Sequence, residues 1–171
     1  KRVGIGLSVD GMGRTFEYLR KEAKWDAVVE NLKQFHKINL DYQKYNKTFF
    51  NYTYTTSWIN AWELPEFHDW FKEHTPSFSI WMNIIHNPEH MCLYTLPLET
   101  KDKIKEKWLS YKGWGKYQSD IEGMIKFMYS KQYTDDELKD IYTRFTILDK
   151  YRAEKTFDVV KDFYPELEQY F

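Results

Sequence analysis

Residues 3–10 alternate aliphatic side chains with small or polar ones. A period of two is typical of a β-strand whose two faces have different surroundings. In a (β/α) barrel, small side chains suit the crowded interior, and polar side chains at a strand's carboxyl end point into the site-bearing mouth. The pattern therefore predicts that Ser8 and Asp10 lie at such a mouth. The alternative is that Asp10 and Gly11 only begin a turn, because both residue types favour turns.

Residues 48–58 form a second predicted strand, rich in aromatic and β-branched side chains. Alternate positions carry either large rings or small hydroxyl and amide groups. If the large rings pack against helices, the other face points inward and ends in Thr55 and Ser57. A register shift of one residue would exchange the two faces.

Residues 77–85 form a third predicted strand, which is almost continuously apolar except at Asn83. Such a run is typical of a buried parallel strand. The H-x-x-E-H pattern that follows begins at His86 and occurs in zinc proteases, where both histidines share a helical face. Pro88 disfavours that helix. We therefore expect a loop in which His86 points to the same mouth as Asn83, or alternatively pairs with Glu89.

Helical spacing of apolar residues follows each of the first two strands and dominates the chain after Pro97. Thr134 and Glu137 have the spacing of a capping box, which predicts a helix start. The second predicted helix places His68 on its polar side. Segment 14–24 is expected to be a solvated charged loop, with a lid over the barrel mouth as the alternative. Segment 39–47 is expected to be a polar turn. The predicted helices are 25–36, 63–73, 98–111, 121–128, one that begins after Thr134, and 156–170 with a bend at Pro165.

Alternation of strands and helices predicts an α/β fold whose strands pair in parallel through right-handed crossovers. Each predicted strand ends in polar side chains, and their recurrence at equivalent ends supports a common mouth. Three strands make only half of a barrel. The expected architecture is thus half of a partial (β/α) barrel over residues 1–97, followed by an α-helical extension over 98–171.

The charge of the chain is nearly balanced, with a formal net charge of −1 at pH 7. It therefore has no global basic field to attract nucleic acid or an anionic membrane. No apolar run approaches the roughly 20 residues that cross a bilayer, so we expect a cytoplasmic protein. Aromatic residues make up 19% of the chain, which indicates either an aromatic core or a large surface for a partner.

Cys92 is the only cysteine in the sequence. One cysteine excludes an intrachain disulfide and any metal site built from several cysteines of this chain. The chain also has neither the Gly-x-Ser-x-Gly elbow of α/β-hydrolases nor a phosphate-cradling glycine loop.

A series of residues over 8–32 resembles the middle of radical SAM enzymes, with the closest likeness to members that carry SPASM or twitch C-terminal extensions. In those enzymes the fourth barrel strand reads similarly and continues into a comparable segment and helix. The likeness extends more loosely to about Pro97. The residues that carry it are S-V-D-G at 8–11, Gly13, Glu17-Tyr18, Arg20, Lys24-Trp25, Val28-Val29 and Asn31-Leu32.

The resemblance implies S-adenosylmethionine and a 4Fe-4S cluster as cofactors. In this family a CxxxCxxC loop supplies three thiolates to the cluster, and that loop is absent from these 171 residues. The resemblance assigns cofactor contacts to Ser8, Asp10, Thr55 and Ser57, and substrate contacts to Asn83 and His86.

The function implied is that of the C-terminal portion of a radical SAM enzyme, inactive without a cluster-binding N-terminal half. That half, or another protein chain, would be its partner. Residues 98–171 resemble a twitch-type helical tail but lack cysteines for auxiliary clusters. The alternative is a non-catalytic protein-binding module derived from a truncated radical SAM fold, for example a phage-borne inhibitor or an assembly subunit.

Overall fold

A computed structural model describes residues 3–43, 45 and 48–171. The chain divides into two compact units, each made of two segments: residues 1–55 with 63–83, and residues 56–62 with 84–171. The predicted sequence domains divide after Pro97 instead, and that boundary stays a prediction. Of the expected turn at 39–47, residues 44 and 46–47 lie outside the described part, as do residues 1–2.

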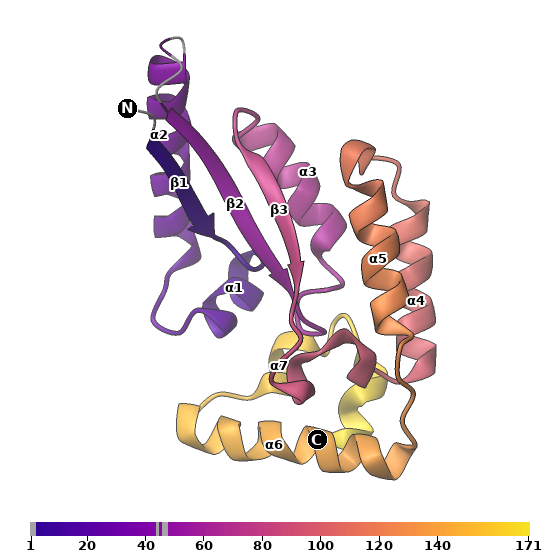
Figure 1. The fold of residues 1–171 in the computed structure, drawn as a ribbon. Coiled ribbons are helices and arrows are strands. Elements are labelled where there is room, and N and C mark those ends of the chain that lie inside the picture. Colours follow the sequence, from indigo (N-terminus) through magenta and orange to yellow (C-terminus); the bar gives the residue numbers. More distant parts are fainter. Residues whose placement is uncertain (1–2, 44, 46–47) are drawn as a thin grey trace. The chain divides into compact units, whose positions relative to one another are not determined.

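Three parallel strands form one open sheet in the order β1-β2-β3, as Figure 1 shows. Ile5 lies opposite Phe50 and Leu7 opposite Tyr52, so paired residues share a face of the sheet. The predicted α/β class with parallel strands is confirmed. The observed strands are slightly shorter than predicted: β1 (Val3–Ser8), β2 (Thr48–Thr56) and β3 (Ser79–Ile84).

The aromatic face of β2 packs against two helices, α2 (Trp25–Gln43) and α3 (Leu64–His74). The ring centroids of Phe50 and Phe35 lie 5.7 Å apart, and Phe35 belongs to α2. From α3, Phe71 lies 5.5 Å from Tyr52. Both helices therefore cover the same side of the sheet, and the predicted assignment of the faces of β2 is confirmed.

The other side of the sheet is exposed along β1 and at single positions of β2 and β3, whereas Asn51 in the middle of β2 is buried. Ser8 and Asn83 are exposed there, and so are two large rings. Trp81 is 63% exposed and Phe49 is 56% exposed, which is unusual for aromatic side chains in a sheet. This face thus presents polar groups together with apolar surface.

The segment after β1 contains a helix where the sequence indicated a loop. Helix α1 (Gly13–Leu19) buries Thr15, Phe16 and Tyr18. The Phe16 ring packs on Trp25 at 5.2 Å between centroids. A seven-residue helix is marginal on its own, so burial of its apolar side chains stabilises it.

The second unit is helical and has a core of aromatic rings around Trp58. The Tyr142 ring lies 5.2 Å from Trp58, and the Phe145 ring lies 5.1 Å from it. Its elements are η1 (Glu89–Met91), η2 (Leu93–Thr95), α4 (Leu98–Ser110), η3 (Gly115–Tyr117), α5 (Gln118–Met128), α6 (Asp135–Arg152), α7 (Thr156–Val160) and η4 (Pro165–Tyr170), where η marks a 3₁₀ helix.

The single bent helix predicted over 156–170 is wrong. Helix α7 ends at Val160, and a separate 3₁₀ helix, η4, begins at Pro165. Proline lacks an amide hydrogen and disfavours a helical conformation in the residue before it, which is Tyr164 here. The chain is therefore interrupted where a bend was expected.

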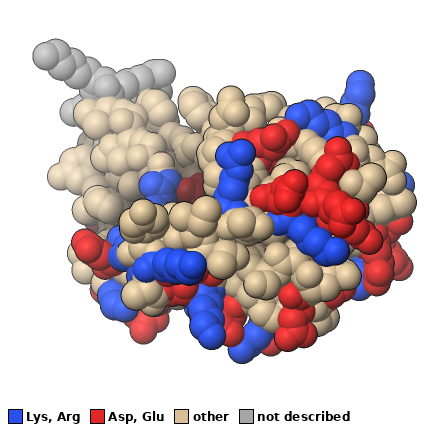
Figure 2. Space-filling view, turned by 90° about the horizontal axis from the view of Figure 1, so that it is seen from below, with Lys and Arg blue, Asp and Glu red and all other residues tan. Residues whose placement is uncertain are grey.

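Acidic and basic side chains are interspersed on the face of the molecule shown in Figure 2, as the balanced net charge indicates. Over the described residues, no helix combines the length and apolar character that a membrane span requires.

Helix α6 begins with the predicted capping box. The Glu137 carboxylate accepts the Thr134 amide at 2.8 Å, and the Thr134 hydroxyl accepts the Glu137 amide at 3.4 Å. These bonds satisfy amide groups that have no partner within the helix. The hydrogen bonds also lower the pKa of Glu137.

We predict that Thr134→Ala lowers the free energy of unfolding by about 1 kcal/mol, because the N-cap acceptor is lost. Thr143→Ala is the matched control, since Thr143 is an exposed threonine in the middle of the same helix whose hydroxyl donates to the Lys139 carbonyl. Alanine is the better helix former there, so we expect no loss. Urea denaturation of both variants measures the difference, and equal effects would contradict the role of the cap.

His68 is buried, which corrects its expected place on the polar side of α3. Only 2% of its surface is exposed. Burial lowers the pKa of His68 to about 4, with Lys72 lowering it further and Asp69 opposing them. The native state therefore holds a neutral imidazole at neutral pH.

We predict that His68 makes the fold sensitive to acid. Its pKa is lower in the native state than the ordinary value of 6.5, so the unfolded state binds its proton first as pH falls. Stability present above about pH 6.5 is then lost progressively down to about pH 4. The difference in unfolding free energy between the wild type and His68→Gln should shrink over that range and stay constant at higher pH. A difference that is independent of pH would refute this prediction.

Candidate functional site

The candidate site begins at the carboxyl end of β1, where Asp10 follows the strand. The Val9 amide still donates to the Thr53 carbonyl at 3.1 Å, which continues the pairing of the two strands. Asp10 is only 7% exposed. Its Oδ1 accepts the Thr55 amide at 2.7 Å. The carboxylate therefore joins the ends of β1 and β2.

Arg20 occupies the other oxygen of the same carboxylate. Its Nε donates to Asp10 Oδ2 at 3.1 Å, and its Nη2 also donates to that oxygen. Arg20 directly follows α1, so this ion pair ties the end of the helix to the end of β1. Charge-assisted bonds of this kind are stronger than neutral ones.

A second carboxylate, that of Glu63, holds the loop after Asp10. Glu63 is mostly buried, and its Oε1 accepts the Met12 amide at 2.9 Å. Gly11 has a φ of +120°, and a Cβ at this position would collide with the same carboxylate oxygen. Only glycine suits both the backbone angle and the close approach. The loop is thus fixed by acidic groups on two sides.

Glu17 and Trp25 extend this framework to α2. The Glu17 carboxylate accepts the Trp25 amide at 2.9 Å, at the start of the helix. The Trp25 ring packs on Trp70 of α3 at 5.3 Å between centroids. Glu17, Arg20 and Trp25 are among the residues that carry the family resemblance, and here they stabilise the surroundings of the strand end.

Four of the predicted site residues belong to the first unit. Asp10 and Thr55 are brought together directly, through the Thr55 backbone amide. Ser8 and Asn83 are exposed on the uncovered face of the same sheet. Asp10 is engaged by protein groups on both oxygens, so its geometry suits a residue that positions the loop. Sequence reasoning assigned no site role to Arg20 or to Glu63.

The other two predicted site residues, Ser57 and His86, belong to the second unit. Ser57 is buried, and its amide and hydroxyl both donate to Asn60 Oδ1, at 2.8 and 3.3 Å. His86 is exposed, and its ring packs edge-on against the Phe127 ring with 4.8 Å between the ring centroids. Their place at a common mouth with Ser8 and Asn83 stays a prediction.

The last two residues of the H-x-x-E-H pattern at 86–90 begin a short 3₁₀ helix, η1. Glu89 accepts hydrogen bonds from Lys131 at 2.9 Å and from Tyr133 at 2.7 Å, and these bonds lower its pKa. The suggested pairing of Glu89 with His86 is therefore not what is observed. Across the described residues, no three histidine, cysteine, aspartate or glutamate side chains are grouped to hold a metal ion.

Cys92 does not suit an iron–sulfur cluster. It is buried, and its thiol donates to the Pro88 carbonyl at 3.6 Å. Burial raises the pKa of the thiol, whereas cluster ligands are thiolates. A single cysteine cannot supply the three ligands of the cluster, and a buried thiol with a raised pKa is not a ready thiolate ligand.

We predict that Asp10→Ala lowers the free energy of unfolding by about 2 kcal/mol, because the half-buried Thr55 amide and the Arg20 guanidinium both lose their acceptor. Asp41→Ala on the exposed surface of α2 is the matched control, and we expect it to change stability by less than about 0.5 kcal/mol. Chemical denaturation gives both values. A loss at Asp10 no larger than that at Asp41 would show that the strand ends hold together without this carboxylate.

Comparisons with models of protein families, with curated proteins and with solved structures give no significant match to this chain. Assignment to a family therefore rests on the residues quoted from the sequence, and it enters below as a proposal.

Proposed function

We propose that this chain is the C-terminal portion of a radical SAM enzyme, in which it forms part of the wall that holds S-adenosylmethionine and substrate. In this proposal the three parallel strands are half of a partial (β/α) barrel. A separate segment that carries CxxxCxxC supplies the cluster, and the protein works in the cytoplasm.

The observation that carries this proposal is the one-sided coverage of the sheet. Helices α2 and α3 cover one face, whereas the other face stays open and carries Ser8 and Asn83. In a (β/α) barrel the helices lie outside, and the sites lie at the carboxyl ends of the strands. The anchored end of β1 at Asp10 gives such a site a rigid border.

The open face suits the polar parts of S-adenosylmethionine. Hydroxyl and amide oxygens, such as those of Ser8 and Asn83, accept hydrogen bonds from ribose hydroxyls and from an ammonium group. Asp10 would act by holding the loop and Thr55 in place. Bound to a reduced cluster, S-adenosylmethionine is the source of the radical that such enzymes use, and the cluster ligands come from outside these 171 residues.

The second candidate function is a non-catalytic protein-binding module. The specific observation in its favour is the exposure of Trp81 and Phe49 on the open face. Large exposed rings on a single face are typical of surfaces that contact another protein. In this case the open face binds a protein partner and no cofactor.

The decisive test begins with the native gene product: its intact mass and reading frame show whether a CxxxCxxC segment belongs to the same chain. We predict that this product binds S-adenosylmethionine after reconstitution with iron and sulfide. Ser8→Ala and Asn83→Ala should each weaken binding about three- to tenfold, because each removes one polar contact. Calorimetric titration measures the dissociation constants.

Ser110→Ala and Asn31→Ala are the matched controls, since both residues are exposed and belong to helices α4 and α2, not to the sheet. Loss of affinity in the controls to the same extent would contradict the assigned face. A native product without the cysteine motif and without affinity for S-adenosylmethionine would overturn the enzyme proposal. The binding-module function would then predict that Trp81→Ser and Phe49→Ser abolish association with a defined protein partner.

A further inference from the structure

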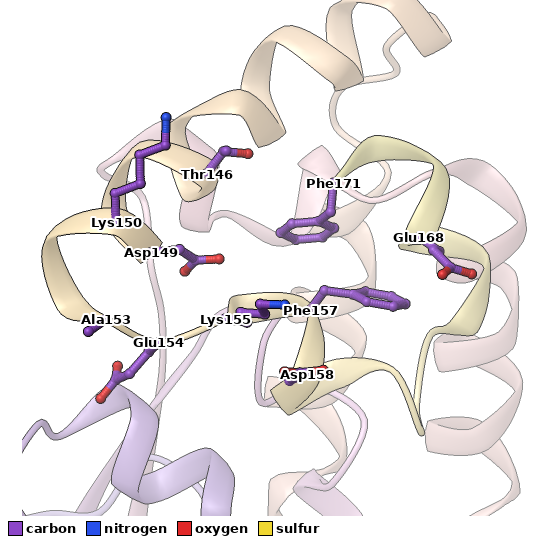
Figure 3. A pocket seen from close by; sticks show the side chains of 10 residues that line it. All are labelled: Thr146, Asp149, Lys150, Ala153, Glu154, Lys155, Phe157, Asp158, Glu168 and Phe171. Carbon is purple, nitrogen blue, oxygen red and sulfur yellow. The ribbon is translucent and has the colours of Figure 1, made fainter.

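The second unit contains a pocket, and none of the predicted site residues lines it. It lies between the end of α6, α7 and η4, and its volume is about 620 Å³. Pockets of roughly 300–1,000 Å³ are typical of small-molecule sites. Figure 3 shows the side chains that line it. The chain turns into this region at Ala153, whose left-handed φ of 52° ends α6.

Two phenyl rings provide the apolar surface of the pocket. Phe157 and Phe171 lie with their centroids 5.6 Å apart. The Phe171 ring is held from behind by Tyr142, edge-on at 5.3 Å, and by Trp58 at 6.5 Å. This surface is therefore anchored in the aromatic core of the unit and offers a fixed platform for an apolar group.

Two of the acidic side chains that line the pocket are already neutralised by cations. Glu154 accepts Nε of Arg152 at 2.8 Å, and Asp158 lies 3.2 Å from Nζ of Lys161. Because each of these carboxylates already has a cationic partner, neither is expected to bind a charged group of a ligand. They form part of the pocket wall.

Charges of both signs remain without an ionic partner at the pocket. Within the part of the chain that is described, the Asp149 carboxylate accepts hydrogen bonds only from the neutral Thr156, from its amide at 2.9 Å and from its hydroxyl at 2.6 Å. Glu168, Lys155 and Lys150 form no side-chain hydrogen bond or ion pair within the part of the chain that is described. In Figure 3, Asp149 and Glu168 lie on opposite sides of the two rings. Lys155 lies beside Phe157, whereas Lys150 extends away from the rings.

We propose that this pocket binds a free amino acid with a large apolar side chain. Its ammonium group pairs with the carboxylate of Glu168, and its carboxylate pairs with Lys155. Its side chain packs on Phe157 and Phe171. Glu168 and Lys155 offer one carboxylate and one ammonium group at the pocket, so a zwitterion matches it better than a ligand of one charge. A peptide end carries only one of the two charges.

The test titrates the 171-residue chain with four probes that differ in one feature each. L-phenylalanine has both charges and the ring, phenethylammonium lacks the carboxylate, hydrocinnamate lacks the ammonium, and L-alanine lacks the ring. Nuclear magnetic resonance shifts of the pocket amides report binding. We expect L-phenylalanine to bind about three- to tenfold more tightly than phenethylammonium and hydrocinnamate, since each exposed charge contact adds little. It should also bind more tightly than L-alanine, which buries no ring.

Two variants assign the charges independently. Lys155→Met should weaken L-phenylalanine and hydrocinnamate but not phenethylammonium. Glu168→Gln should weaken L-phenylalanine and phenethylammonium but not hydrocinnamate. Lys126→Met on α5 and Glu106→Gln on α4 are matched controls, because both residues are exposed and neither lines the pocket.

Three outcomes would overturn the proposal. The first is equal binding of all four probes, or binding of none. The second is an analogue of a single charge that binds as tightly as L-phenylalanine. The third is binding of L-phenylalanine that neither pocket variant weakens, while unchanged shifts elsewhere show that both variants are folded.

Discussion

The aromatic face of β2 is the constraint on which the first unit depends. Phe50, Tyr52 and Tyr54 are almost fully buried, and their removal from water requires cover along the whole strand. Helices α2 and α3 supply it from the same side of the sheet. Because all large rings of β2 except Phe49 point to that side, β2 presents mostly small and polar groups on the opposite face, beside the exposed ring of Phe49.

The loop at the end of β1 follows from this arrangement. Parallel pairing brings the ends of β1 and β2 to the same edge, where backbone amides lose their partners in the sheet. Asp10 satisfies the Thr55 amide, and Glu63 satisfies the Met12 amide. Burial of a carboxylate is costly without donors, so Arg20 completes the arrangement. A rigid polar border beside an open face is what a binding site requires, and it stabilises the fold as well.

The second unit uses aromatic rings differently. Its rings gather around Trp58 and make a core of edge-on and tilted contacts, which are favourable geometries for aromatic pairs. At the margin of that core, Phe171 and Phe157 remain partly exposed. The pocket in Figure 3 is therefore a continuation of the core to the surface, with charged side chains around it.

The sequence by itself determined the features that depend on local periodicity and backbone preference. The period of two in 48–58 indicated which face of β2 is buried, and Thr134 with Glu137 indicated the start of α6. These signals are readable because the side-chain alternation of a strand and the amide groups of a helix start involve near neighbours in the chain.

Only the tertiary structure decided the features that depend on distant partners. Packing of Phe16 on Trp25 stabilises helix α1. His68 is buried although it lies outside the apolar stripe of α3, because the packing of α3 covers more of the helix than that stripe. Asp10 finds Arg20 and Thr55, which lie 10 and 45 residues away in the chain. The pocket likewise requires α6, α7 and η4 to meet. Spacing along the chain does not encode such approaches, because long-range packing sets them.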